Sequence, residues 1–117
     1  MAFEYHEFSM IFPLIEGDRF ESLKADILKN GQLDPVILYD GKILDGRNRY
    51  RALVELGIPP KFQHSKASTD EEALRESVSR NFTRRDLLPA QRAMIAADLL
   101  PMFEAIARKK QAHGMTA

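Results

Sequence analysis

The chain has 117 residues with 17 Lys and Arg against 17 Asp and Glu, so its formal net charge is zero. Cysteine is absent, which excludes disulfides, thiol nucleophiles and thiolate metal sites, and the three histidines lack the spacing of a zinc site. The charges are nevertheless divided along the chain. Residues 1–46 carry nine acids and four bases, while residues 47–117 carry eight acids and thirteen bases. Such an asymmetry, −5 against +5, indicates a polyanionic partner.

The first third of the chain is expected to form an extended segment, a helix and a hairpin. Aromatic and apolar side chains partly alternate with polar ones over residues 3–12, which is typical of a strand or an extended docking segment. Apolar residues at helical spacing then predict a helix over residues 19–29, with Asp18 as its N-cap. Two apolar runs, residues 35–39 and 42–44, are separated by Asp-Gly, which predicts a β-hairpin with a type I′ turn.

Helices dominate the prediction after the hairpin. An apolar stripe predicts a helix over residues 47–56, followed by a short strand over residues 61–64. Ser68 and Glu71 have the spacing of a capping box and predict the start of a helix that ends near residues 80–81.

A last helix is expected to begin at Pro89 and to be interrupted or kinked at Pro101. The expected fold class is α+β: a small mixed sheet with a hairpin and packed helices, followed by a C-terminal helical extension. We expect the domain to comprise residues 1–88 and the extension residues 89–117. No apolar run is long enough to cross a membrane, so we expect a cytoplasmic protein without a membrane partner.

The first candidate site is the start of the helix over residues 47–56. The first N–H groups of a helix lack intrahelical partners and lie at its positive dipole end, so this position favours an anion. Gly46 allows close approach, and Arg47, Asn48, Arg49 and Arg51 follow it. Arginine suits forked contact with phosphate oxygens, yet arginines here oppose the dipole at a cost of about 0.3–1 kcal/mol each. A solvated face whose arginines pair with acids is the alternative, and the pattern leaves both open.

The second candidate site is an arginine-rich stretch between two predicted helices. Its members could close over a phosphate chain or contact a DNA backbone. The alternative, which the pattern favours when taken alone, is a solvated loop in which Asp86 caps the next helix. The candidate residues are Arg80, Asn81, Thr83, Arg84 and Arg85.

The two stretches resemble the two motif boxes of the ParB/sulfiredoxin-like superfamily, in particular the ParB N-terminal domain, also called the ParB-like nuclease domain. Residues 34–37 and 45–52 resemble its "PI.V" strand and its Gly-Glu-Arg-Arg-Tyr/Trp-Arg-Ala box. Residues 80–89 resemble its Glu-Asn-x-Gln-Arg-x-Asp-Leu-x-Pro box. The resemblance extends over about residues 10–100 and implies a ParB/sulfiredoxin-like fold, followed by a helix that leads towards a helix-turn-helix domain.

The resemblance also implies a function. ParB N-terminal domains bind CTP with magnesium, and relatives use ATP, so a nucleoside triphosphate is the expected cofactor, with magnesium beside it and Asn81 as a candidate ligand. The expected protein is a bacterial, plasmid or phage DNA-binding protein of partition or transcription regulation. DNA would bind through a region outside this chain or at its end, and a homodimer is an expected assembly. The nucleotide-binding residues implied are Gly46, Arg47, Asn48, Arg49, Arg51, Arg80, Asn81, Thr83, Arg84 and Arg85.

The sequence departs from the two boxes at their acids. Arg47 and Arg80 replace glutamates that the family associates with metal handling and turnover, so nucleotide hydrolysis does not follow from the resemblance and no catalytic residue is assigned. Sulfiredoxin activity is excluded because it requires a cysteine. The alternative function is a ParB-like nuclease or phosphotransfer enzyme acting on DNA, for which Asp45 is the best-placed acid. A third hypothesis is a scaffold whose arginines contact DNA backbone directly.

Overall fold

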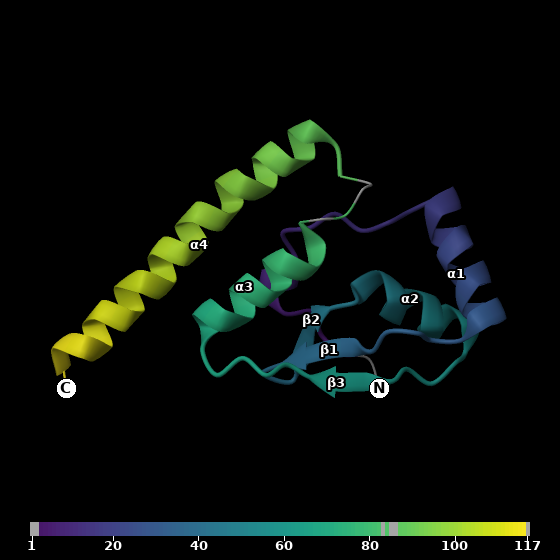
Figure 1. Ribbon diagram of the computed structural model, residues 1–117, viewed down its shortest axis with the longest axis horizontal. Helices are drawn as coiled ribbons and strands as arrows, with labels where there is room; N and C mark the ends of the chain where they lie inside the picture. The colour runs from purple at the N-terminus through teal and green to yellow at the C-terminus, as the bar shows by residue number, and fades with distance from the viewer. Residues whose placement is uncertain (1–2, 83, 85–86, 117) are drawn as a thin grey trace. The chain divides into compact units, whose positions relative to one another are not determined.

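The computed structural model describes residues 3–82, 84 and 87–116, with side chains as far as residue 111 (Figure 1). Its contacts divide the chain into two compact units, Met1–Lys66 and Ala67–Ala117. Helices and a small mixed sheet confirm the α+β class. In chain order the elements are the 3-10 helix η1 (Glu7–Ser9), α1 (Asp18–Asn30), β1 (Val36–Tyr39), β2 (Lys42–Asp45), α2 (Arg47–Leu56), β3 (Phe62–His64), α3 (Asp70–Asn81) and α4 (Pro89–Thr116).

The sheet of the first unit has the strand order β2-β1-β3, with β1 antiparallel to β2 and parallel to β3. The hairpin between β1 and β2 is the predicted one: Asp40 and Gly41 have φ values of 53° and 74°, as a type I′ turn requires. The register shifts between Ile37 and Leu38 of β1, which marks a β-bulge. The bulge lies just before the end of β2, where the chain turns into α2.

The N-terminal segment, residues 3–17, forms a single bridge and the short helix η1 in place of a regular strand, which was one of the two alternatives expected over residues 3–12. Tyr5 forms an isolated parallel bridge with Ile43 of β2. The Ile43 N–H donates to the Glu4 carbonyl at 2.8 Å, and the His6 N–H donates to the Ile43 carbonyl at 2.8 Å. The chain then enters η1, so its pairing with the outer edge of β2 is brief.

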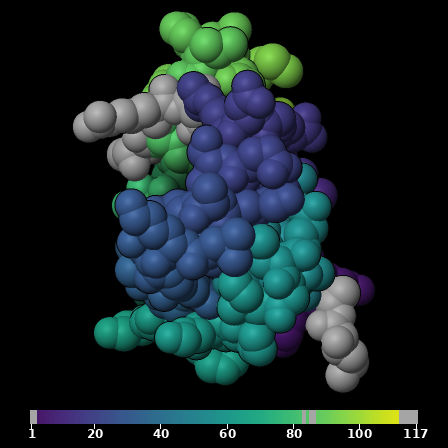
Figure 2. Space-filling view, turned by 90° about the vertical axis from the view of Figure 1, so that its right-hand side faces the viewer, coloured from purple at the N-terminus to yellow at the C-terminus, as the bar shows by residue number. Residues whose placement is uncertain are grey.

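Helix α2 packs between the sheet and α1. Its Tyr50 joins the buried strand residues Val36, Leu38 and Ile43 in one cluster. On its other side, Ala52 and Leu53 pack against α1 in a second cluster with Phe20 and Ile27. Figure 2, which views the surface around α1, shows the residues leading into α1 and α1 itself as one continuous surface. The N-cap of α1 is Gly17, so the prediction of Asp18 was wrong by one residue.

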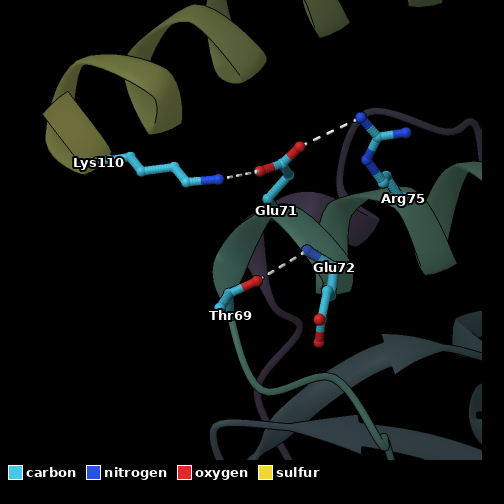
Figure 3. Close-up of polar contacts among 5 residues, drawn as sticks. All are labelled: Thr69, Glu71, Glu72, Arg75 and Lys110. Carbon is cyan, nitrogen blue, oxygen red and sulfur yellow. Dashed lines mark hydrogen bonds and ion pairs between the residues drawn. The ribbon is translucent and has the colours of Figure 1, made fainter.

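Helices α3 and α4 of the second unit run antiparallel. Lys110 near the end of α4 lies 3.8 Å from the Glu71 carboxylate at the start of α3 (Figure 3). The Arg75 guanidinium of α3 lies 5.8 Å from the centre of the Phe103 ring of α4. These contacts tie the first turns of α3 to the second half of α4.

The capping box of α3 lies one residue beyond the predicted one. Thr69 is the N-cap, and its side chain accepts a hydrogen bond from the Glu72 N–H at 3.2 Å (Figure 3). The Glu72 carboxylate accepts from the Ser68 N–H at 2.7 Å. The Ser68/Glu71 prediction was therefore wrong: Glu71 instead pairs with Arg75 at 3.1 Å.

Pro101 does not end α4, which continues from Pro89 to Thr116. A proline removes one N–H donor to the carbonyl four residues earlier. Here both Pro101 and Ala97, which carries that carbonyl, are exposed, so water can replace the lost hydrogen bond. No helix within the described ranges combines the length and the hydropathy that a membrane crossing requires.

Candidate functional site

The first part of the candidate site is the junction between β2 and α2. Gly46 is the N-cap of α2 and adopts a left-handed conformation, with φ of 96° and ψ of 24°. A Cβ atom at this position would lie 3.3 Å from the Cα of Val36, so the junction presses closely against β1. The first turn of α2 contains no acid, and Gly46 has no side chain to cap it. The positive end of the helix dipole is thus not offset by a carboxylate in that turn.

Arg47, the first residue of α2, is directed into the protein. It is only 7% exposed, although arginine is rarely buried without partners. Its guanidinium donates to the Phe12 carbonyl, lies 3.7 Å from the Met10 sulfur and sits over the Tyr5 ring, 5.8 Å from the ring centre. Arg47 therefore fastens the N-terminal segment to α2. Phosphate contact by Arg47 stays a prediction.

Asn48 and Arg51 hold a second point of the N-terminal segment. The Ile15 N–H donates to Asn48 Oδ1 at 2.8 Å, and Arg51 Nη1 donates to the Ile15 carbonyl at 3.1 Å. The Arg51 guanidinium also lies over the Phe20 ring of α1, 4.4 Å from its centre. Both backbone polar groups of Ile15 are thus satisfied by side chains of α2. These contacts give Asn48 and Arg51 a structural role, and phosphate contact by either stays a prediction.

Arg49 has a different environment. Its Nη2 lies 3.6 Å from Asp34 Oδ2, and the side chains of Arg49 and Asp34 are 26% and 76% exposed. Arg49 Nη1 lies only 3.7 Å from the position that a Cβ on Gly46 would occupy. The guanidinium therefore lies over the Gly46 turn, beside the helix start, with an exposed carboxylate as its partner. Asp45, the acid considered for nuclease chemistry, is half-buried at the end of β2 opposite Ile37.

The second arginine stretch belongs to the second unit. Arg80 Nε donates to the Glu76 carboxylate one turn earlier in α3, at 3.0 Å. The Asn81 side-chain N–H donates to the Ser77 carbonyl at 2.8 Å, and the Arg84 N–H donates to the Asn81 carbonyl at 3.1 Å. The remaining predicted residues of this stretch, Thr83 and Arg85, and the predicted cap Asp86 lie outside the described residues.

The ten predicted residues are thus divided between the two units. The first unit holds the five from Gly46 to Arg51, and the second holds the five from Arg80 to Arg85. That both sets bind one ligand stays a prediction. Within the part of the chain that the structure describes, no three His, Asp or Glu side chains gather in a metal-binding group. A magnesium ion carried by a nucleotide is held largely by phosphate and water, so Asn81 stays a candidate ligand.

Arg92 is a residue that sequence reasoning missed. In the first turns of α4 it donates from Nη2 to the Arg84 carbonyl at 2.7 Å and from Nη1 to the Phe82 carbonyl. Its guanidinium lies 5.4 Å from the centre of the Phe82 ring. Arg92 thereby holds the described part of the loop that follows α3. Its sequence signal was an arginine near the start of a helix that has no acid in its first turn, the same departure from helix-dipole preference as at α2.

The fold is a small α+β fold in which a three-stranded mixed sheet leads through a glycine into an arginine-bearing helix. No family model and no curated protein matches the chain. A solved structure described as the C2221 form of a Pnob8-like ParB-N domain is similar, with a TM-score of 0.68 and 21% sequence identity over 94% of this chain. The chain therefore has a ParB-N-like fold, as the two boxes predicted. It covers 47% of the length of that solved chain.

Proposed function

We propose that the chain is a ParB-N-like module that binds a nucleoside triphosphate, CTP or ATP, with phosphate at the start of α2. The observation that carries this proposal is the position of Arg49. Its guanidinium lies beside the left-handed Gly46, at a helix start without an acid in its first turn. A phosphate there would accept hydrogen bonds from backbone N–H groups of α2 and from the planar fork of Arg49.

The three arginines of α2 have separate roles in this proposal. Arg47 and Arg51, four residues apart on one helix face, hold the N-terminal segment and keep α2 in place. Arg49 lies on another face and supplies the direct phosphate contact. Arg84 is the corresponding candidate in the second unit, and Asn81 is the candidate magnesium ligand.

A wider role is part of the same proposal. The fold similarity to a ParB-N domain supports a bacterial, plasmid or phage protein of partition or transcription regulation that works in the cytoplasm. DNA would bind through a region outside this chain or at its end, and the protein would act as a homodimer. Each of these statements depends on the fold similarity and on the two boxes.

The direct test is thermal unfolding of the full chain with millimolar CTP or ATP and magnesium. A ligand at about 100 times its Kd stabilises the folded state by about 2.7 kcal/mol, which raises the melting temperature measurably. Arg49→Ala should abolish the shift, and Arg49→Lys should reduce it because lysine lacks the fork. Lys29→Ala, which removes one exposed positive charge from the last turn of α1, is the matched control and should keep the shift.

Two other functions are separated by two further assays. A nuclease or phosphotransfer enzyme would cut plasmid or oligonucleotide with magnesium or manganese, and Asp45→Asn would abolish the cutting. A direct DNA scaffold would show filter binding that falls steeply with salt and needs no nucleotide. An unchanged melting temperature with both nucleotides would contradict the proposed nucleotide site.

A further inference from the structure

The residue that faces Arg49, Asp34, is anchored through its backbone. Asp34 precedes Pro35 and β1, and its carbonyl accepts a hydrogen bond from the Gln32 side chain at 3.0 Å. The same Gln32 amide is fixed at both ends by Lys61: it donates to the Lys61 carbonyl at 2.8 Å and accepts from the Lys61 N–H at 2.7 Å. The backbone of Asp34 is therefore anchored, although its side chain is exposed.

The Asp34–Arg49 ion pair contributes little to stability. The carboxylate is 76% exposed and its oxygen lies 3.6 Å from the guanidinium nitrogen. Exposed pairs of this kind are weak because water screens both charges. A carboxylate nevertheless presents the same planar pair of oxygens to arginine as a phosphate does. Asp34 therefore lies beside the guanidinium that a phosphate at the helix start would need.

We propose that Asp34 is an internal competitor for the phosphate site and weakens phosphate binding there. The Asp34 carboxylate binds Arg49 when no ligand is present, and a phosphate must displace it. Because the exposed ion pair is weak, this competition lowers the affinity for a phosphate at the helix start only modestly. This inference rests on the proposed phosphate site at α2.

The test measures the affinity of the full chain for CTP and for inorganic phosphate by isothermal titration calorimetry. Asp34→Asn keeps the size of the side chain but removes its charge, and it should strengthen binding of both probes about five-fold. Glu55→Gln removes one exposed acid from the other end of α2 and should change affinity less than two-fold. The gain should disappear in the double variant Asp34→Asn/Arg49→Ala, which should bind no better than Arg49→Ala.

The outcomes distinguish a failure of the proposed role of Asp34 from a failure of the proposed phosphate site at α2. If the wild type binds CTP and Asp34→Asn binds it equally well, the competitor role is overturned and the phosphate site stands. If Asp34→Asn binds more tightly in the absence of Arg49 as well, the effect is a general field effect and the competitor role is again overturned. If neither protein binds either probe, the proposed site fails and the competitor role fails with it. Without ligand, the melting temperatures of Asp34→Asn and Glu55→Gln should equal that of the wild type.

Discussion

Replacing Gly46 with alanine should destabilise the first unit more than replacing Gly57 with alanine. Both glycines are left-handed caps of α2, with φ values of 96° at the start and 71° at the end. They differ in their surroundings: a Cβ at Gly46 would lie 3.3 Å from the Cα of Val36, whereas one at Gly57 would meet no atom within 4 Å. Gly57→Ala is thus a control that changes backbone preference without changing packing.

The expected losses of stability have two contributions, the left-handed backbone conformation and the close contact with Val36. A left-handed conformation costs alanine about 1–2 kcal/mol at either position. Overpacking adds about 1–3 kcal/mol at Gly46, because the neighbouring atom belongs to the backbone of Val36, which is fully buried in the central strand, and cannot rotate away. Gly46→Ala should therefore lower the free energy of unfolding by about 2–5 kcal/mol and Gly57→Ala by about 1–2 kcal/mol.

Urea unfolding followed by tyrosine fluorescence measures this difference in the full chain. The chain has no tryptophan, and its three tyrosines all lie in the first unit, so the signal reports that unit. The midpoint should fall for both variants with little change in slope. Equal losses for the two variants would show that the close approach of Gly46 to Val36 has no energetic consequence and would refute the reasoning.

Three further predictions concern the side chains around the two sites. Arg47→Ala should cost about 2–3 kcal/mol because it leaves a buried carbonyl without its donor, whereas Arg49→Ala should cost at most about 1 kcal/mol; equal losses in the same urea titration would contradict their separate roles. Thr69→Ala should lower the free energy of unfolding by about 1 kcal/mol and Ser68→Ala by only a few tenths, in urea titrations followed by far-UV circular dichroism. The reverse order would contradict the capping assignment. Arg92→Ala should speed tryptic and chymotryptic cleavage at the end of α3, and digestion at the wild-type rate would show that its carbonyl contacts do not hold the loop.

The elements that the sequence predicted best are bounded by glycines. Helix α2 begins and ends where predicted because Gly46 and Gly57 stop helical pairing on both sides. The Asp40-Gly41 hairpin was equally clear because few residues accept two successive positive φ values. These signals depend on the backbone conformation of one or two residues, so tertiary packing rarely changes the turn or helix end that they predict.

Two other predictions failed where local signals are ambiguous. Ser68 and Thr69 are both good N-caps, and each has a glutamate three residues later, so spacing alone cannot choose between them. Pro101 predicts an interruption or a kink from its missing donor; the interruption is absent, because it also depends on whether water reaches the carbonyl four residues earlier. Both choices depend on surroundings that the sequence does not state.

The candidate site was proposed from the sequence, but the sequence did not show that its arginines make different contacts. Helical periodicity places Arg47 and Arg51 on one face and Arg49 on another. Periodicity does not say which face meets the N-terminal segment, because that packing depends on residues more than thirty positions away. Arg92 was missed for a different reason: its partners are nearby backbone carbonyls, which the pattern of side chains does not identify.

The excess of positive charge after residue 46 therefore overstates the cationic surface of the protein. Four of those thirteen bases contact groups of the chain itself: Arg47, Arg51 and Arg92 donate to backbone carbonyls, and the exposed Arg80 pairs with a carboxylate. These hydrogen bonds fix the orientation of each guanidinium, so a polyanion must approach the N–H donors that remain. Arg49 gives up only a screened contact with an exposed acid. A ligand bounded to one or a few phosphates fits this distribution better than a long nucleic-acid track, which needs many exposed charges in a row.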